Sequence, residues 1–99
     1  MKQIITATVI DYNNKIICTK TNNYTKTHPL QAHFAKLANK PQNIFLHAEI
    51  AAIIGAKNKQ IKSIIISRFN KQGQPKLAKP CPICELAIKF YQIKHIYHT

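Results

Sequence analysis

β-Branched and apolar residues are concentrated in two short stretches near the start of the chain. Residues 3–10 and 15–21 are rich in β-branched side chains, and the turn-forming sequence Asp11-Tyr12-Asn13-Asn14 separates them. Two such stretches joined by a short polar turn are typical of a β-hairpin. The pattern therefore predicts that a hairpin opens the domain.

Apolar residues then recur at helical spacing in two segments. The first begins at Pro29, a residue favoured in the first turn of a helix, and the second begins near His47 and ends near Gly55 or Asn58. Their apolar stripes consist of Leu30, Phe34 and Leu37 in the first segment and of Ile50, Ile53 and Ile54 in the second. Two helices are predicted here.

The next apolar segment has a different pattern. Residues 61–69 contain the unbroken run Ile64-Ile65-Ile66. A run of this kind is typical of a central strand that is covered on both faces. The following residues 70–79 contain Gly73 and Pro75 and are predicted to be a loop.

The C-terminal part reads as one more helix and one more strand. A third helix is predicted from residue 80 to about residue 91, with a last strand at residues 94–98. Its inward-facing residues are predicted to be Leu86, Ala87 and Phe90. The order β-β-(α)-α-β-α-β predicts an α/β fold with a mixed sheet, in which the last two strands run parallel.

Composition restricts the function classes. The 99 residues suit one domain spanning residues 1–99, and no apolar run is long enough to cross a bilayer. The first residues lack a secretory signal pattern, so we expect a cytoplasmic protein without membrane contact. The formal net charge of +12 favours an anionic partner such as a phosphate group. Because the lysines are scattered, the charge alone does not demonstrate nucleic-acid binding.

The chain has three cysteines, and two of them lie close together in Cys81-Pro82-Ile83-Cys84. In a reducing compartment such a pair binds metal or performs redox chemistry more often than it forms a disulfide. At the start of a helix, positions i and i+3 put both sulfurs on one side, where the helix dipole favours thiolates. The third cysteine, Cys18, is predicted to be a small core residue.

A histidine close to an acidic residue completes the candidate chemistry. Glu49 follows His47 by two residues, in a chain with only three acidic side chains. Two thiolates and one imidazole leave the fourth position of a tetrahedral Zn²⁺ for water, which is the pattern of a catalytic site. A zinc-bound water that attacks an aromatic ring needs a carboxylate to take up its proton.

These motifs have two other interpretations. A structural zinc site would need a fourth protein ligand, for which the candidates are His28, His33, His95 and His98. None of them has ligand-like pairing. A redox role fits poorly, because the cysteines do not follow the first strand as they do in thioredoxin-like proteins.

His47-Ala48-Glu49 followed by Pro80-Cys81-Pro82-Ile83-Cys84 resembles the H-x-E and P-C-x-x-C signature of the cytidine deaminase-like superfamily. The resemblance looks closest to deoxycytidylate deaminases and small deaminase-like proteins of phages. It implies a three-layer α/β/α sandwich, one catalytic zinc and hydrolytic release of ammonia. The family's leading helix and its final helix and strand are not found here. One sheet face is therefore expected to lack cover, and a homo-oligomer is expected to bury it.

The resemblance also implies roles for individual residues. It implies that His47, Cys81 and Cys84 are the zinc ligands and that Glu49 is the proton shuttle. It also implies that Asn22 contacts the sugar or base. The backbone N–H of Ala48 would donate to the ring carbonyl, and the carbonyl of Pro80 would accept from the exocyclic amine. Asn23 competes with Asn22 for its role. Residues 22–47 are expected to wall the pocket, with Tyr24, His28 and Phe34 as candidates for base or phosphate contact.

Three functions follow as hypotheses. The first is a deaminase of free cytosine nucleosides or nucleotides. The second is a deaminase of single-stranded DNA or RNA, including tRNA adenosine, which must receive an unstacked base. The third is a zinc-stabilised binding module without catalysis, although such a module would have no use for Glu49.

Overall fold

The computed structural model describes residues 4–99. Its elements are the strands β1 (Ile5–Ile10), β2 (Ile16–Thr21), β3 (Ser63–Phe69), β4 (Pro75–Lys76) and β5 (His95–His98) and the helices α1 (Pro29–Leu37), α2 (Ala48–Gly55) and α3 (Pro82–Phe90). The predicted order is confirmed, with β4 added inside the segment predicted to be a loop. Residue 3 of the first predicted strand lies outside the described residues. In residues 4–99 no helix has the length and apolar character that a membrane span requires.

The strands form one mixed sheet. β1 pairs antiparallel with β2 on one side and with β3 on the other. β5 pairs parallel with β3 through residues 63–66, and β4 pairs antiparallel with the last residues of β3. The predicted α/β fold and the predicted parallel pair are confirmed, because α3 connects β3 to β5.

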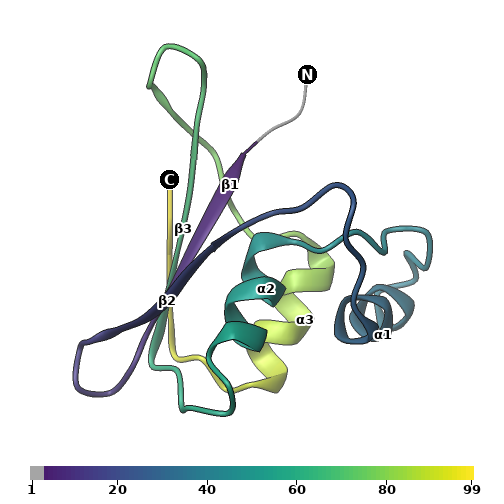
Figure 1. Ribbon diagram of the computed structural model, residues 1–99, viewed down its shortest axis with the longest axis horizontal. Coiled ribbons are helices and arrows are strands. Elements are labelled where there is room, and N and C mark those ends of the chain that lie inside the picture. Colours follow the sequence, from purple (N-terminus) through teal and green to yellow (C-terminus); the bar gives the residue numbers. More distant parts are fainter. Residues whose placement is uncertain (1–3) are drawn as a thin grey trace.

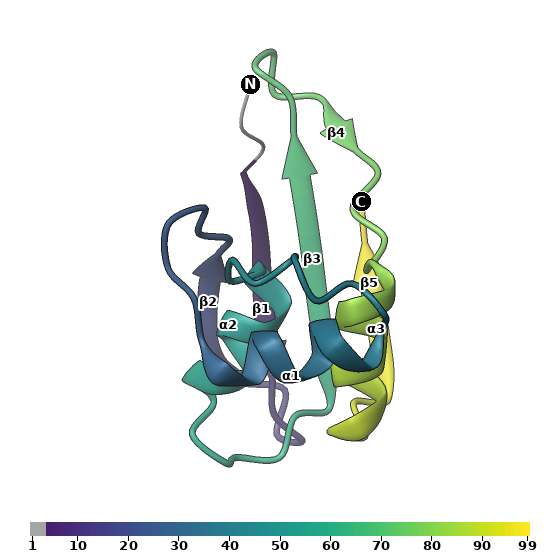
Figure 2. The same cartoon turned by 90° about the vertical axis from the view of Figure 1, so that its right-hand side faces the viewer.

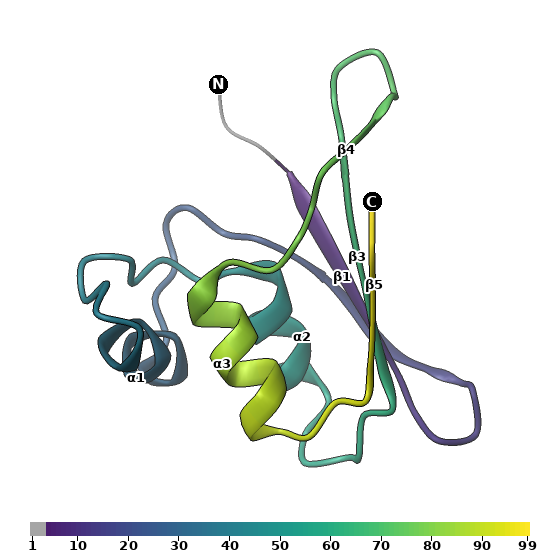
Figure 3. The same ribbon diagram turned by 180° about the vertical axis from the view of Figure 1, so that it is seen from behind.

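All three helices lie on the same side of this sheet (Figure 1; Figure 3 shows the same from behind). α2 packs against β1 and β2, while α1 packs against α3 on the side away from the sheet. The layers are therefore sheet, helix pair and single helix. The predicted α/β/α order is wrong for the described residues, since they contain no helix that covers the opposite face.

The central strand shows the consequence of this one-sided packing. Ile64 and Ile66 are fully buried under the helices, whereas Ile65 between them is 40% exposed. The prediction that β3 is covered on both faces is wrong, because successive side chains on a strand point to opposite faces. Beside Ile65 lie Thr8 of β1 and Tyr97 of β5. One face lacks cover, as expected, and its burial by a second copy stays a prediction.

The inward face of α3 also differs from the prediction. Ala87 is buried, but Leu86 and Phe90 are largely exposed. The buried residues of the helix are Ile83, Cys84, Ala87 and Ile88. Phe90 instead packs edge-to-face against the Phe34 ring of α1, with 5.7 Å between ring centroids. The helix is rotated so that Cys84 points inward.

The C-terminal end of α2 approaches β2 closely. A Cβ atom added at Gly55 would lie 2.8 Å from the sulfur of Cys18 and 3.0 Å from Cε of Lys20. The Cys18 thiol also donates a hydrogen bond to the Ala52 carbonyl at 3.4 Å. Cys18 is thus half-buried and packs against the core, where a small side chain was predicted.

We expect Gly55→Ala to destabilise the protein by about 1–3 kcal/mol, because the new methyl group overlaps the Cys18 sulfur. The higher helix propensity of alanine, about 1 kcal/mol, works in the opposite direction. The double variant with Cys18→Ala should recover most of the loss. Urea unfolding of the three proteins measures both effects. A Gly55→Ala variant as stable as the parent would show that the two elements do not approach this closely.

Candidate metal centre

Two helices begin side by side at one end of the helix layer. His47 is the N-cap residue of α2 and Cys81 is the N-cap residue of α3. Both have extended backbone conformations, and neither side chain caps its own helix. Cys84 lies one turn into α3 and is fully buried. The three side chains are therefore available to one another.

Their ligand atoms form a compact group. Nδ1 of His47 lies 3.3 Å from Sγ of Cys84 and 3.5 Å from Sγ of Cys81. In a tetrahedral zinc site, Zn–N and Zn–S bond lengths of about 2.1 and 2.3 Å place nitrogen and sulfur roughly 3.6 Å apart. The observed spacing matches this value. The group could hold a metal ion, and its donors are compatible with Zn²⁺.

The protonation states of the two thiols are coupled. A hydrogen bond from Cys84, helped by one from His47, lowers the pKa of Cys81 to about 4. The same hydrogen bond with Cys81 and burial raise the pKa of Cys84 well above its usual value. The hydrogen bond to Cys81 also raises the pKa of His47. The pKa shifts favour the thiolate form at Cys81 and the thiol form at Cys84, and a metal ion would replace the proton between the two sulfurs.

Glu49 lies in the first turn of α2 and is only 5% exposed. Burial raises the pKa of its carboxyl group, and hydrogen bonds, including one with Cys84, partly offset this effect. A carboxyl group whose pKa is raised takes up a proton more readily than a free one. Glu49 is therefore a buried titratable group beside the ligand group.

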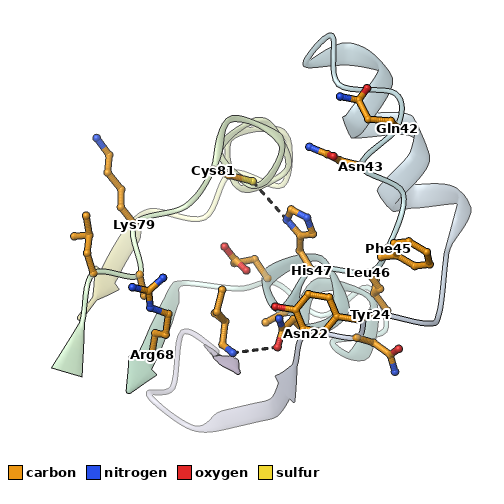
Figure 4. Close-up of a pocket in the computed structure, with 16 residues that line it drawn as sticks. Asn22, Tyr24, Gln42, Asn43, Phe45, Leu46, His47, Arg68, Lys79 and Cys81 are labelled. Carbon is orange, nitrogen blue, oxygen red and sulfur yellow. Dashed lines mark hydrogen bonds between the residues drawn. The ribbon is translucent and has the colours of Figure 1, made fainter. Parts of the chain in front are cut away.

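A cavity of about 350 Å³ opens next to these side chains (Figure 4). This volume lies within the usual range for small-molecule sites. Its lining includes His47, Ala48, Glu49 and Cys81, all near the two helix starts. Further wall residues come from the loops after β2, before α2 and after β4. Two members of the ligand group, His47 and Cys81, thus face the same space as Glu49, and Cys84 is buried behind them.

Asn22 and Asn23 both line the cavity, but their side chains make different hydrogen bonds. The amide oxygen of Asn23 accepts three hydrogen bonds of 2.8 Å, from the Thr25 amide, the Thr25 hydroxyl and the Lys26 amide. Asn23 therefore stabilises its own turn. The amide oxygen of Asn22 accepts a hydrogen bond from the Ile5 amide at 3.0 Å, which orients its side chain at the edge of the cavity (Figure 4). This arrangement favours Asn22 for ligand contact.

The other predicted residues are placed differently. Ala48 and Tyr24 line the cavity, whereas Phe34 belongs to the core. His28 is not among the residues that line it, because its imidazole caps α1 by accepting the Leu30 amide at 3.0 Å. Pro80 is buried beside Cys81 and also lies outside this lining.

One residue that the sequence pattern did not single out supports the site. Gln31 of α1 is fully buried. Its amide nitrogen donates to the Asn43 carbonyl at 3.1 Å, and its amide oxygen accepts the backbone N–H of His47 at 3.2 Å. Gln31 therefore holds the start of α2 and the preceding loop together. The signal available in the sequence was a polar residue, Gln31, about one helical turn before the apolar Phe34.

Comparison with known proteins adds no identification. No model of a protein family matches the chain, and neither a curated protein nor a solved structure gives a significant match.

We expect the protein to bind about one zinc ion per chain and Cys81→Ser or Cys84→Ser to lower the affinity more than about 100-fold. Loss of a thiolate removes one corner of the tetrahedron. Cys18→Ser is the matched control, because Cys18 is a half-buried cysteine outside the group. Chelator competition followed by elemental analysis measures the affinity. Equal losses in all three variants would exclude the assigned ligands.

Gln31→Leu should weaken zinc binding about 10- to 100-fold, because the backbone of the ligand His47 loses its partner. Gln60→Leu, on the surface before β3, is the control and should bind zinc like the parent. The same chelator competition provides the measurement. If Gln31→Leu lowers only the unfolding temperature and leaves zinc affinity unchanged, Gln31 has no role in positioning His47.

Proposed function

We propose that the protein is a zinc-dependent hydrolase that deaminates a nucleobase, with cytosine in a nucleoside or nucleotide as the substrate. The observation that carries the proposal is that His47 and Cys81 of the His-Cys-Cys group line the same cavity as Glu49, with Cys84 buried behind them. The resemblance to the cytidine deaminase-like signature gives this combination its chemical meaning.

Deamination requires that one water molecule be added and one ammonia molecule be released. A C–O bond forms at the ring carbon while the exocyclic C–N bond breaks. Zinc held by His47, Cys81 and Cys84 would supply an activated water molecule at neutral pH. Glu49 would take up one proton of that water and pass it to the ring nitrogen. It would then take up the second proton from the new C–OH group and pass it to the amine, which leaves as ammonia.

The cavity walls offer groups that can orient a base. Ala48 is the first residue of α2, where backbone N–H groups have no partner within the helix. An N–H group in this place suits the ring carbonyl of a pyrimidine. The Asn22 amide lies on the wall formed by the end of β2. These two contacts would keep the amino-bearing carbon next to the ligand group.

One observation favours the second candidate, a deaminase of single-stranded nucleic acid. Tyr24 and Phe45 line the cavity and are 42% and 47% exposed. Exposed aromatic rings beside a basic cavity can stack on neighbouring bases of a strand. Free nucleotides remain the first proposal, because the cavity is of small-molecule size.

The test is a deamination screen by mass spectrometry with zinc-loaded protein. The panel contains cytosine and adenine nucleosides, their monophosphates and short single strands. We expect Glu49→Gln to reduce turnover at least about 100-fold while zinc stays bound, because proton transfer is lost. Glu85→Gln is the control, since Glu85 lies exposed in the first turn of α3.

The outcomes separate the candidates. Conversion of a monomer that Glu49→Gln abolishes supports the first proposal, and conversion only within strands supports the second. If folded, zinc-loaded protein converts nothing in the panel, the enzymatic proposal fails and a zinc-stabilised binding module takes its place.

A further inference from the structure

The charges around the cavity are distributed unevenly. The chain has three acidic residues, and only Glu49 lines the cavity. Asp11 lies in the turn between β1 and β2, where it accepts backbone hydrogen bonds. Glu85 lies on α3 at a different hollow. Two basic residues, Arg68 and Lys79, belong to the cavity lining.

The two basic residues come from the same wall. Figure 4 shows both on one side of His47, with Phe45 on the other side and Tyr24 below His47. Arg68 lies near the end of β3 and is half-buried. Lys79 lies in the segment from β4 to α3 and is exposed.

The backbone that carries Arg68 is held on both sides. Its N–H group donates to the hydroxyl of Thr99 at 3.1 Å, and Arg68 pairs with Lys76 of β4. The Thr99 hydroxyl also donates to the Lys76 carbonyl, so that β3, β4 and Thr99 form one unit. This unit fixes the position on the cavity wall from which the Arg68 side chain leaves the backbone.

We propose that Arg68 and Lys79 form a phosphate subsite, so that the substrate is a phosphate ester of a nucleoside and not the nucleoside itself. This inference rests on the proposed function and adds its substrate class. The guanidinium group of Arg68 can bind two phosphate oxygens at once, and the Lys79 ammonium group adds a second positive charge from the outer part of the wall. The phosphate can belong to a free nucleotide or to a strand.

The proposed reaction gives no task to these two cations, because zinc bound by the ligand group together with Glu49 would carry out the chemistry. An anionic group on the ligand would be attracted to the wall that carries them.

The experiment measures binding of reaction products, so that no turnover is needed. Zinc-loaded protein is titrated calorimetrically with uridine and uridine 5′-monophosphate, with inosine and inosine 5′-monophosphate, and with a short uridine strand that has hydroxyl ends. We expect the phosphorylated member of one pair to bind at least about tenfold more tightly than its nucleoside. Arg68→Gln should remove most of this preference while leaving nucleoside affinity unchanged.

Further variants show whether the effect is specific. Lys79→Gln should reduce the preference in part, and Arg68→Lys should retain some of it, because the charge stays but the two-point contact is lost. Lys71→Gln is the control, since Lys71 is exposed in the turn between β3 and β4 and does not line the cavity. Thermal unfolding checks that every variant is folded.

The results decide the proposal in each case. Tighter binding of a monophosphate than of the strand supports a free nucleotide, and salt-sensitive tighter binding of the strand supports a phosphodiester. No phosphate preference in either pair, no binding of any probe, or a preference that survives Arg68→Gln overturns the subsite. A preference that Arg68→Gln removes, in a protein that deaminates nothing, would overturn the proposed reaction and leave the subsite standing.

Discussion

The contact between the first turns of α2 and α3 is the constraint on which the site depends. It brings an imidazole, two sulfurs and a carboxyl group into a largely buried space. Burial of such groups is costly unless they are paired with one another or with a metal ion. Hydrogen bonding between the thiols, with His47 as a further partner, provides that pairing and lowers the pKa of Cys81 to about 4. Any sequence change that separates the two helix starts would leave these groups buried without partners.

Because all three helices pack on one side of the sheet, the first turns of α2 and α3 can come into contact. Because α2 packs on β1 and β2 and α3 follows β3, both helices begin at the same end of the layer (Figure 2 shows the layer face-on). α1 then lies outside the pair, and from there Gln31 reaches the backbone of His47. The opposite face of the sheet takes no part in the site. Exposed Ile65 and Tyr97 lie on that face, which no helix of the described residues covers (Figure 1).

The cavity assembles the remaining functions from segments that are distant in the chain. Asn22 comes from the end of β2, Phe45 from the loop before α2, and Arg68 from the end of β3. The wall with Tyr24 and Phe45 is aromatic, and the wall with Arg68 and Lys79 is basic. A ligand with a flat ring and an anionic group matches this asymmetry, which is why the proposed reaction and the proposed phosphate subsite agree.

The sequence by itself determined the features that depend on neighbouring residues. The element order follows from local periodicity, and the His47-Ala48-Glu49 and Cys81–Cys84 motifs place their side chains within one helical turn. Only the tertiary structure decided which face of each element is covered: Ile65 is exposed although its neighbours are buried, and Phe90 packs on α1. The roles of His28, Gln31 and Arg68 were decided in the same way, because their partners or the walls they share come from distant segments. Local patterns record the spacing of residues along the chain, and contacts across the chain depend on how the helices pack on the sheet.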